Sequence, residues 1–443
     1  MSPTRKYSKP KLVILNQYYV PDVASTGHLL HELAAELASQ GWDVSVITCR
    51  PSYGPRESWQ PAPRKEVHDG VRVHRMWTTR FSKDNLLGRA CNYFSFFGQL
   101  ALRMLFTSRH DVVYLYTTNP PFLGAIGGFV SIFRRHTYVK LLHDAYPQLA
   151  IWVGTIKKDG VVARVWHALN RLAYGRASQN IVLCKAAKKL VADTYGLEDS
   201  RIHVIPNWAD EDKLVPMPKA ECECAKEHGL LEPFTVLYSG NLGLYYEFET
   251  IMEVAERLKD ENFKLVFVGS GGRKGWIADE IKKRGLTNTI MLPYQPFERL
   301  NDSLNSCDAS LVTIAKGIEG ISYPSKLYSS LAVGKPILAL SEKESELREI
   351  LENYDMGVWV ELGDADTLVA GIRGLMADPE LAAKQGRNCR KRFEERYTRT
   401  VAAKAYGDVF ELADPRNVRA AAAAQNDAEA DLTSEESKPG DAA

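Results

Sequence analysis

Short apolar runs alternate with helical stretches along this chain, and no other feature of the sequence limits the fold as strongly. The first run, Leu12–Gln17, is followed by a turn-forming stretch and by a helical pattern from about Gly27 to Ser39. Further strands are predicted at residues 44–48, 71–76, 112–116, 138–142, 180–184 and 203–205. Strands that alternate with helices in this way predict a parallel sheet flanked by helices.

The alternation stops in a polar, charged connection at about residues 207–233 and then begins again. The second series predicts strands at residues 235–239, 264–268, 289–292 and 309–314, with helices at 248–259, 275–283 and 297–305. We therefore predict an α/β fold with two Rossmann-like domains, one over residues 1–206 and one over residues 207–394. Two such domains facing each other form an interdomain cleft, and ligands lie there beyond the carboxyl ends of the strands.

The C-terminal part of the chain is expected to leave the second domain. A last helix near residues 395–412 is predicted to pack back on the first domain. Residues 415–443 are small and acidic and lack the apolar side chains that a core needs, so we expect a disordered tail there.

The charge balance and the cysteines exclude some classes of protein. The 443 residues include 56 Lys and Arg against 55 Asp and Glu, which argues against a general nucleic-acid binder. The seven cysteines are scattered and show no paired Cys-x-x-Cys spacing, so a reduced cytoplasmic interior is the simplest setting. Residues 1–11 are polar and basic, without the apolar stretch of a signal peptide.

Two stretches were compared with the pattern of a membrane span. Residues 112–133 carry no charge, but Asn119-Pro120-Pro121 would break a helix in its middle, which predicts a strand, a turn and a short helix. Residues 85–106 are aromatic and apolar, yet Arg89 and Arg103 leave only 13 uncharged residues between them, too few to cross a bilayer. An aromatic helix between basic residues suits a peripheral contact with a membrane surface. A core helix of the first domain fits the same pattern.

Residues 317–338 are predicted to form a small-residue loop that brings a ligand to the start of a helix. Pro324 and Ser325 suit the first helical turn, and Gly334 suits its end before the next strand. Lys326 then lies in the first turn, where a cation is unfavourable unless an anion is bound. This position therefore predicts a phosphate site.

Two glycine-containing turns follow strands of the second domain. Gly240 and Gly243 come after the first strand and would let backbone N–H groups approach a phosphate. The turn at residues 269–274 follows the next strand and supplies Arg273. Neither turn is a complete phosphate-loop pattern, and each alone fits an ordinary connection between strand and helix. Together with Lys326 they favour a nucleotide diphosphate.

A histidine and an aspartate stand where a strand of the first domain ends. His143 could bond a sugar hydroxyl or a leaving phosphate, and Asp144 could orient it or cap the next helix. For an isolated pair of this kind the helix cap is the commoner outcome. Asn207, near the end of this domain, is interpreted as a turn residue.

Several short motifs follow one another in a definite order over roughly residues 10–412. They are Asn16-Gln17-Tyr18-Tyr19-Val20-Pro21 with Thr26-Gly27, Asn119-Pro120-Pro121, His143-Asp144-Ala145-Tyr146-Pro147, Ile205-Pro206-Asn207-Trp208, Tyr238-Ser239-Gly240-Asn241, Gly269-Ser270-Gly271, and Pro324-Ser325-Lys326 through Gly334-Lys335-Pro336. In order and spacing they resemble the retaining GT-B glycosyltransferases of family 4, especially the bacterial branch that assembles lipid-linked saccharides for capsule, O-antigen or exopolysaccharide. The resemblance implies the GT-B fold.

The resemblance also implies a nucleotide-sugar donor held mainly by the second domain and an acceptor held by the first. The matching donor residues are Gly240, Asn241, Arg273 and Lys326 at the diphosphate, Tyr294 within residues 292–295 at the base, Gly320, Ile321 and Ser322 at the sugar, and Ser325 and Ser329 on the helix. His143 matches the active-site histidine, and with Asp144 and Glu319 it is expected to be catalytic. Tyr19, Thr26 and Gly27 lie on the acceptor side.

The resemblance implies a transfer that needs no metal ion. Cations and helix N-termini, rather than a metal ion, would therefore offset the negative charge of the leaving UDP. No metal ligand and no cofactor is expected beyond the nucleotide-sugar itself.

The chain departs from the family pattern at two places. Relatives carry two Glu separated by seven residues, and Ile321 and Ser329 stand at these positions, with Glu319 two residues early. The ribose contact of the second Glu would be weaker here, or made by Ser329 or another group. The Arg and Lys that usually follow the first strand of the donor domain are missing from residues 240–248.

We expect transfer of a hexose or N-acetylhexosamine from a UDP-sugar to a lipid-linked polyprenyl diphosphate saccharide, with retention of configuration. The expected location is cytoplasmic and peripheral, at the inner face of the plasma membrane. Two other functions fit the same sequence. A UDP-sugar 2-epimerase shares the two-domain cleft, and a non-catalytic GT-B subunit would explain why Ser329 replaces glutamate.

Overall fold

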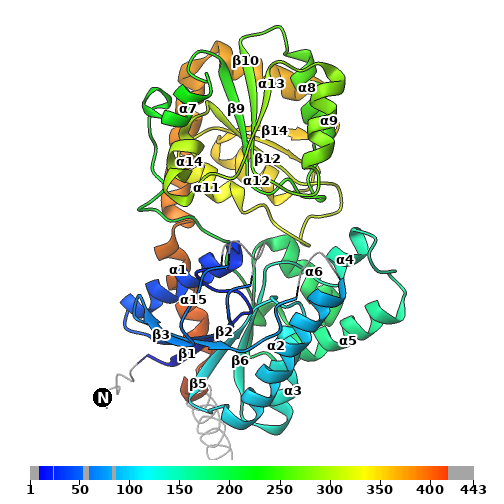
Figure 1. Cartoon of the computed structure of the whole chain (residues 1–443), viewed down its shortest axis with the longest axis vertical. Coiled ribbons are helices and arrows are strands. Elements are labelled where there is room, and N and C mark those ends of the chain that lie inside the picture. Colours follow the sequence, from blue (N-terminus) through cyan, green and yellow to red (C-terminus); the bar gives the residue numbers. More distant parts are fainter. Residues whose placement is uncertain (1–8, 23, 53–58, 82–85, 418–443) are drawn as a thin grey trace, which may run out of the picture.

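The structure is a computed structural model that describes residues 9–22, 24–52, 59–81 and 86–417. It contains two β-sheets, one in each half of the chain, and helices cover each sheet (Figure 1). The two Rossmann-like halves face each other, which confirms the predicted GT-B fold class.

The first sheet has eight strands in the order β3-β4-β2-β1-β5-β6-β7-β8. Its strands are β1 (Lys11–Leu15), β2 (Asp43–Cys49), β3 (Lys65–His68), β4 (Val71–Met76), β5 (Val112–Tyr116), β6 (Thr137–Leu142), β7 (Gln179–Val182) and β8 (Ile202–Val204). Its helices are α1 (Ser25–Ser39), α2 (Leu86–Thr107), α3 (Leu123–Phe133), α4 (Gln148–Trp152), α5 (Val161–Arg176) and α6 (Lys185–Tyr195). All neighbouring strands are parallel except β3 and β4. β5 is buried along its whole length, as its uninterrupted apolar run requires.

The second sheet has six parallel strands in the order β11-β10-β9-β12-β13-β14. Its strands are β9 (Phe234–Ser239), β10 (Phe263–Val268), β11 (Thr289–Leu292), β12 (Ala309–Thr313), β13 (Ile337–Ser341) and β14 (Gly357–Glu361). Its helices are α7 (Glu223–Glu227), α8 (Glu249–Arg257), α9 (Lys274–Arg284), α10 (Leu300–Asn305), α11 (Lys326–Ala332), α12 (Glu346–Tyr354) and α13 (Ala365–Ala377). The central strands β12 and β13 are fully buried, because helices cover both of their faces.

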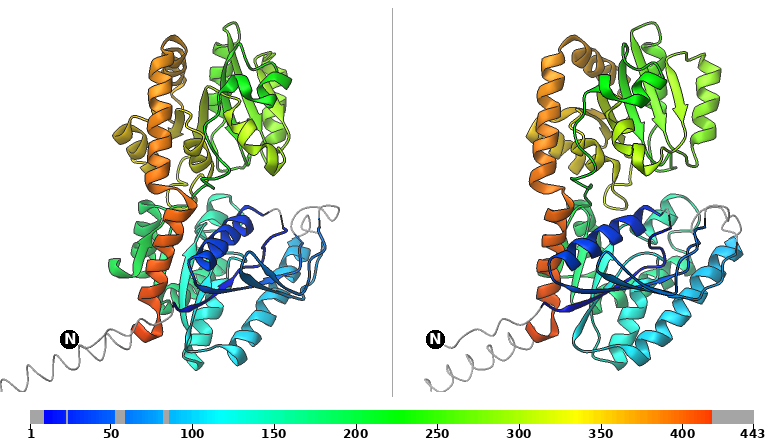
Figure 2. Two further views of the ribbon diagram at one scale, coloured as in Figure 1. Left: turned by 90° about the vertical axis from the view of Figure 1, so that its left-hand side faces the viewer. Right: turned by 60° about the vertical axis from the view of Figure 1, so that its left-hand side comes forward.

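Two long helices follow the second sheet and lead the chain back. α14 (Pro379–Arg396) lies against the second half, and α15 (Arg399–Ala413) lies against the first (Figure 2). α15 buries Tyr406 and Phe410 in one apolar cluster with Leu37 and Trp42 of the first half. The chain therefore crosses between the halves twice.

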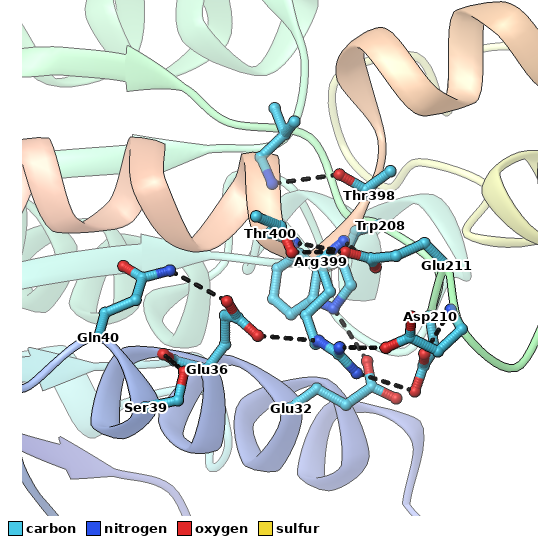
Figure 3. Close-up of polar contacts among 12 residues, drawn as sticks. Glu32, Glu36, Ser39, Gln40, Trp208, Asp210, Glu211, Thr398, Arg399 and Thr400 are labelled. Atoms are coloured by element: carbon cyan, nitrogen blue, oxygen red, sulfur yellow. Dashed lines mark hydrogen bonds and ion pairs between the residues drawn. The ribbon is translucent and has the colours of Figure 1, made fainter.

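The two crossings lie side by side and are tied by Arg399 (Figure 3). Ala209 on the outgoing segment pairs with Thr398 on the returning one in an isolated bridge. The Arg399 guanidinium lies 3.2 Å from the Glu36 carboxylate of α1 and 3.1 Å from that of Asp210. These contacts hold the halves at the hinge, so that the carboxyl ends of their strands can share one site.

The structure corrects the predicted elements at a few places. β3 is missed by the sequence pattern because it is a short edge strand whose side chains are mostly exposed. The strand predicted to reach residue 184 ends at Val182, because Cys184 is the N-cap of α6 and accepts a hydrogen bond from the Ala187 amide. In the described part of the chain, no helix is long and apolar enough to span a bilayer. The disordered tail was predicted from residue 415, but residues 415–417 are helical, and the rest of the predicted tail lies outside the described residues.

Candidate active site

The turns after β9 and β10 meet at the carboxyl edge of the second sheet. Gly240 and Gly269 have φ values of 134° and 142°, a backbone conformation that residues with a Cβ atom rarely adopt. A Cβ on Gly269 would lie 2.0 Å from the carbonyl oxygen of Gly240, so only glycine allows these two turns to touch. Lys326 joins them, because its Cε lies 3.4 Å from where a Cβ on Gly240 would stand.

Lys326 is a buried lysine enclosed by tyrosines. Its Nζ donates a hydrogen bond to the Tyr238 hydroxyl at 2.6 Å and lies 3.5 Å from the centre of the Tyr246 ring. Burial lowers the pKa of Lys326 well below its usual value. Among the described residues, no carboxylate lies within 4.0 Å of this ammonium group to compensate it. The surroundings of Lys326 therefore suit an anionic ligand.

Three other predicted donor residues, Asn241, Arg273 and Tyr294, lie in the connections after β9, β10 and β11. Arg273 stacks on Trp276 at 4.0 Å and forms an ion pair with Glu249, so a diphosphate would compete with that carboxylate. The exposed Asn241 donates to the Tyr245 hydroxyl at 3.3 Å. Tyr294 is more than half exposed and its hydroxyl donates to the Ser270 carbonyl, which leaves the ring accessible to a base.

His143 and Asp144 follow β6 and meet the second half of the chain. The Ser322 hydroxyl donates a hydrogen bond to the Asp144 carboxylate at 2.6 Å, and the Ala145 amide donates to the Ile321 carbonyl at 2.7 Å. The structure thus brings the predicted acceptor-side motif and the predicted sugar loop into direct contact. Burial, and then the charge of Lys140, lowers the pKa of His143 to about 4. Burial raises the pKa of Asp144, against the hydrogen bond from Ser322.

Glu319 lies elsewhere. Its carboxylate accepts a hydrogen bond from the Glu346 amide at 3.0 Å, at the start of α12. Gly320 has a φ of 76°, and a Cβ there would lie 2.8 Å from the Ala186 carbonyl carbon at the start of α6. Glu319 therefore caps the first N–H group of α12 in this structure, and its catalytic role stays a prediction.

The two serines of the donor helix make local contacts. Ser325 is the exposed residue before α11, and no side-chain cap forms there. The Ser329 hydroxyl donates to the Lys326 carbonyl at 3.0 Å, within its own helix. A ribose contact from Ser329 would replace that bond.

The predicted acceptor-side residues hold the connection between β1 and α1. The buried Tyr19 shares a hydrogen bond of 3.1 Å with His31 Nδ1. The Thr26 hydroxyl accepts from the Asn119 amide at 3.0 Å, and Gly27 packs against the Tyr18 carbonyl, 3.2 Å from where its Cβ would stand. The structure thus shows contacts of these residues within the first half, and their acceptor-side role stays a prediction.

Sequence reasoning missed the tyrosines that surround Lys326. Tyr246 stands in the stretch 240–248, in which the resemblance led us to look for Arg and Lys. Its ring meets Lys326, which comes 80 positions later in the sequence. Trp152 was missed as well, and its Nε1 donates to the Lys316 carbonyl at 2.9 Å across the two halves. The sequence did contain a signal for the Tyr246 contact: the aromatic stretch at residues 245–246 could have been matched with Lys326, the lysine in the first turn of the donor helix.

Comparison with known proteins supplies the family. The model described as "Glycosyl transferase 4-like domain" matches residues 26–208, and the model described as "Glycosyl transferases group 1" matches residues 223–392. The chain is 25% identical to a probable glycosyltransferase WbjE of Pseudomonas aeruginosa, over 78% of this chain and 84% of the relative. It is 26% identical to a putative colanic acid biosynthesis glycosyl transferase WcaI of Escherichia coli, over 84% of this chain and 93% of the relative.

Solved structures show the same fold. Sucrose-phosphate synthase from Thermosynechococcus elongatus superimposes with a TM-score of 0.70 at 16% identity, covering 93% of this chain and all of that one. HepE of Anabaena in complex with UDP-glucose gives a TM-score of 0.67 at 15% identity, covering 91% and 99%. The two family models together match most of the chain. The chain therefore belongs to the group 1 glycosyltransferases of family 4 and has their GT-B fold.

Proposed function

We propose that this protein transfers a hexose or N-acetylhexosamine from a UDP-sugar to a lipid-linked polyprenyl diphosphate saccharide, with retention of configuration. The observation that carries the donor part is the buried, tyrosine-lined Lys326, for which no described carboxylate provides a counter-charge. A diphosphate beside Gly240 would neutralise this cation and accept hydrogen bonds from it. UDP is favoured because HepE, a structural neighbour, is described in complexes with UDP and UDP-glucose.

The same cation accounts for the chemistry. When the bond between sugar and diphosphate breaks, negative charge grows on the leaving UDP. Lys326 is buried, so little water screens its interaction with that charge, and a hydrogen bond from its ammonium group would stabilise the leaving UDP. His143 is neutral near pH 7, since its pKa is about 4, and can hydrogen-bond the sugar without adding charge. With no enzyme nucleophile assigned, the acceptor hydroxyl attacks from the face that UDP leaves, and a UDP phosphate oxygen takes its proton.

Exposed apolar side chains support the lipid part of the proposal. Phe94 and Phe106 on α2 are exposed, and so are Phe129 and Phe133 on α3, the helix beside α2. Arg134 follows α3 and is also exposed. Aromatic side chains next to a cation suit contact with the surface of an anionic bilayer, where a polyprenyl-linked acceptor resides. A peripheral position at the cytoplasmic face of the membrane follows from this proposal.

The donor part is tested by titrating UDP, GDP and ADP into the protein and measuring Kd by calorimetry. We expect UDP to bind most tightly and Lys326→Ala to weaken it at least about tenfold, because a charge-assisted contact contributes on the order of 1.5–3 kcal/mol. Lys282→Ala, an exposed lysine at the end of α9, is the matched control and should bind UDP like the wild type. If none of the three nucleotides binds the wild type, the proposal fails.

Two further readouts separate the alternatives. Conversion of a UDP-sugar to its epimer without any acceptor would favour a 2-epimerase over a transferase. Binding of UDP without turnover on any lipid-linked saccharide would favour a non-catalytic subunit. Retention is read from the anomeric coupling constants of the product by NMR.

A further inference from the structure

Two histidines and an aspartate converge at the edge of the first sheet, on the acceptor half of the molecule. His31 comes from α1, whereas His68 is the last residue of β3 and Asp69 lies in the turn between β3 and β4. The Asp69 Oδ2 atom lies 3.1 Å from His31 Nε2 and 3.6 Å from His68 Nε2. All three atoms lie within 4.8 Å of one another.

The backbone of the hairpin fixes two of these side chains. Asp69 and Gly70 form the two-residue turn between β3 and β4, with φ values of 48° and 76°. Positive φ at both central residues is the geometry of a tight hairpin turn, and aspartate is one of the few side chains that tolerate it. His68 is the last residue of β3, so the register with β4 sets its position as well.

A buried hydroxyl orients the third side chain. His31 Nδ1 shares its hydrogen bond with the hydroxyl of Tyr19, which is 1% exposed. Histidines that bind metals generally use one ring nitrogen for the ion and the other for such an orienting hydrogen bond. With Nδ1 engaged, Nε2 of His31 is directed at Asp69 and His68.

We propose that His31, His68 and Asp69 bind a divalent transition metal ion, of which Zn²⁺ is the best-fitting class. Two imidazoles and one carboxylate are a ligand set that zinc accepts, with a water molecule in the fourth position. Ligands about 2.1 Å from a tetrahedral ion stand about 3.4 Å apart, close to the two separations measured here. Arg75, the nearby buried cation, is paired with Glu66 at 2.6 Å, so its charge is largely compensated.

The ion would connect parts of the chain that are distant in sequence. It would tie the β3–β4 edge hairpin to α1 and, through His31, to Tyr19 in the connection after β1. This site is separate from the donor site around Lys326, and neither proposal depends on the other.

The test is a titration of EDTA-treated, full-length protein with Zn²⁺, together with Co²⁺ absorption spectroscopy. We expect one ion per chain, visible Co²⁺ bands typical of tetrahedral coordination, and at least a tenfold weaker Kd in His68→Ala and in Asp69→Asn. Both side chains are at least half exposed, so these variants should fold. His110→Ala, an exposed histidine away from the cluster, is the matched control.

Two results would overturn the proposal. One is the absence of stoichiometric binding by the wild type, which would leave the three side chains as a hydrogen-bonded group. The other is equal Zn²⁺ affinity in the wild type and in His68→Ala, which would place the ion elsewhere, for instance at a cysteine.

Discussion

At the scale of single residues, a buried histidine couples the stability of the first half to pH. His136 is held between the Ser108 hydroxyl at 2.6 Å and the Tyr116 hydroxyl at 2.9 Å. Burial lowers its pKa to about 3. An unfolded histidine titrates near pH 6.5, so below that pH the unfolded chain binds a proton that the folded chain does not. The free energy of unfolding therefore decreases as the pH falls from about 6.5 towards 3, because His136 stays neutral in the folded chain.

The change that tests this linkage is His136→Gln, which cannot be protonated. Between pH 7 and pH 5 the wild type should lose about 2 kcal/mol of unfolding free energy through His136. Over the same pH interval, the unfolding free energy of the variant should fall by about 2 kcal/mol less than that of the wild type. The variant is nevertheless expected to be less stable than the wild type at pH 7. Urea unfolding at both pH values measures the difference. The exposed His110→Gln should keep the wild-type dependence, and parallel behaviour of wild type and His136→Gln would contradict the assignment.

Residue types and spacing predicted part of the candidate site but not all of it. Lys326 could be placed because a helix start, a helix end and a first-turn cation are all local features. The two alternating series predicted domains whose strand ends face one another, but the contact of Asp144 with Ser322 itself was not predicted. The stacking of Tyr246 on Lys326 and the capping of α12 by Glu319 depend on how distant loops pack. No local pattern contains that information.

At the scale of elements, α2 combines the two interpretations that its sequence allowed. Phe96, Leu100 and Met104 are fully buried and form part of the core. Phe94 and Phe106 are about 70% exposed on the other face. A helix with apolar side chains on both faces packs on its own domain and still offers a second apolar surface.

We predict that replacing the exposed phenylalanines of α2, Phe94 and Phe106, weakens membrane binding without unfolding the protein. The variant Phe94→Ser/Phe106→Ser should bind vesicles containing anionic lipid at least about tenfold more weakly, since each inserted ring contributes on the order of 1 kcal/mol or more. Flotation of protein with vesicles measures the bound fraction. The control is Leu231→Ser/Leu244→Ser, two exposed leucines of the second half. Equal flotation of the α2 variant and the wild type would remove α2 from the membrane contact.

At the scale of the whole molecule, the two halves are joined at a hinge, at several loop contacts and through an apolar cluster to which both halves contribute. The hinge is the pair of crossings that Arg399 ties to Glu36 and Asp210 (Figure 3). Arg399 also pairs with Asp212. One of the loop contacts is the meeting of Asp144 with Ser322 in the cleft.

Arg399 should therefore contribute more to stability than an ordinary surface ion pair does. Asp210 is 4% exposed and would lose its guanidinium partner in Arg399→Gln, which leaves Lys213 as its remaining cation. We expect a loss of about 1–3 kcal/mol in the free energy of unfolding, measured by guanidinium denaturation.

The matched control is Arg373→Gln, since Arg373 pairs with Glu261 at 2.7 Å but its side chain is 56% exposed. Water and salt screen that pair, so its loss should cost less than about 1 kcal/mol. Because Arg399 joins two segments that are nearly 190 residues apart in sequence, its loss should also separate the unfolding of the two halves into distinct transitions. A single transition with the stability of the control would show that Arg399 is not needed to couple the halves, which also share an apolar cluster.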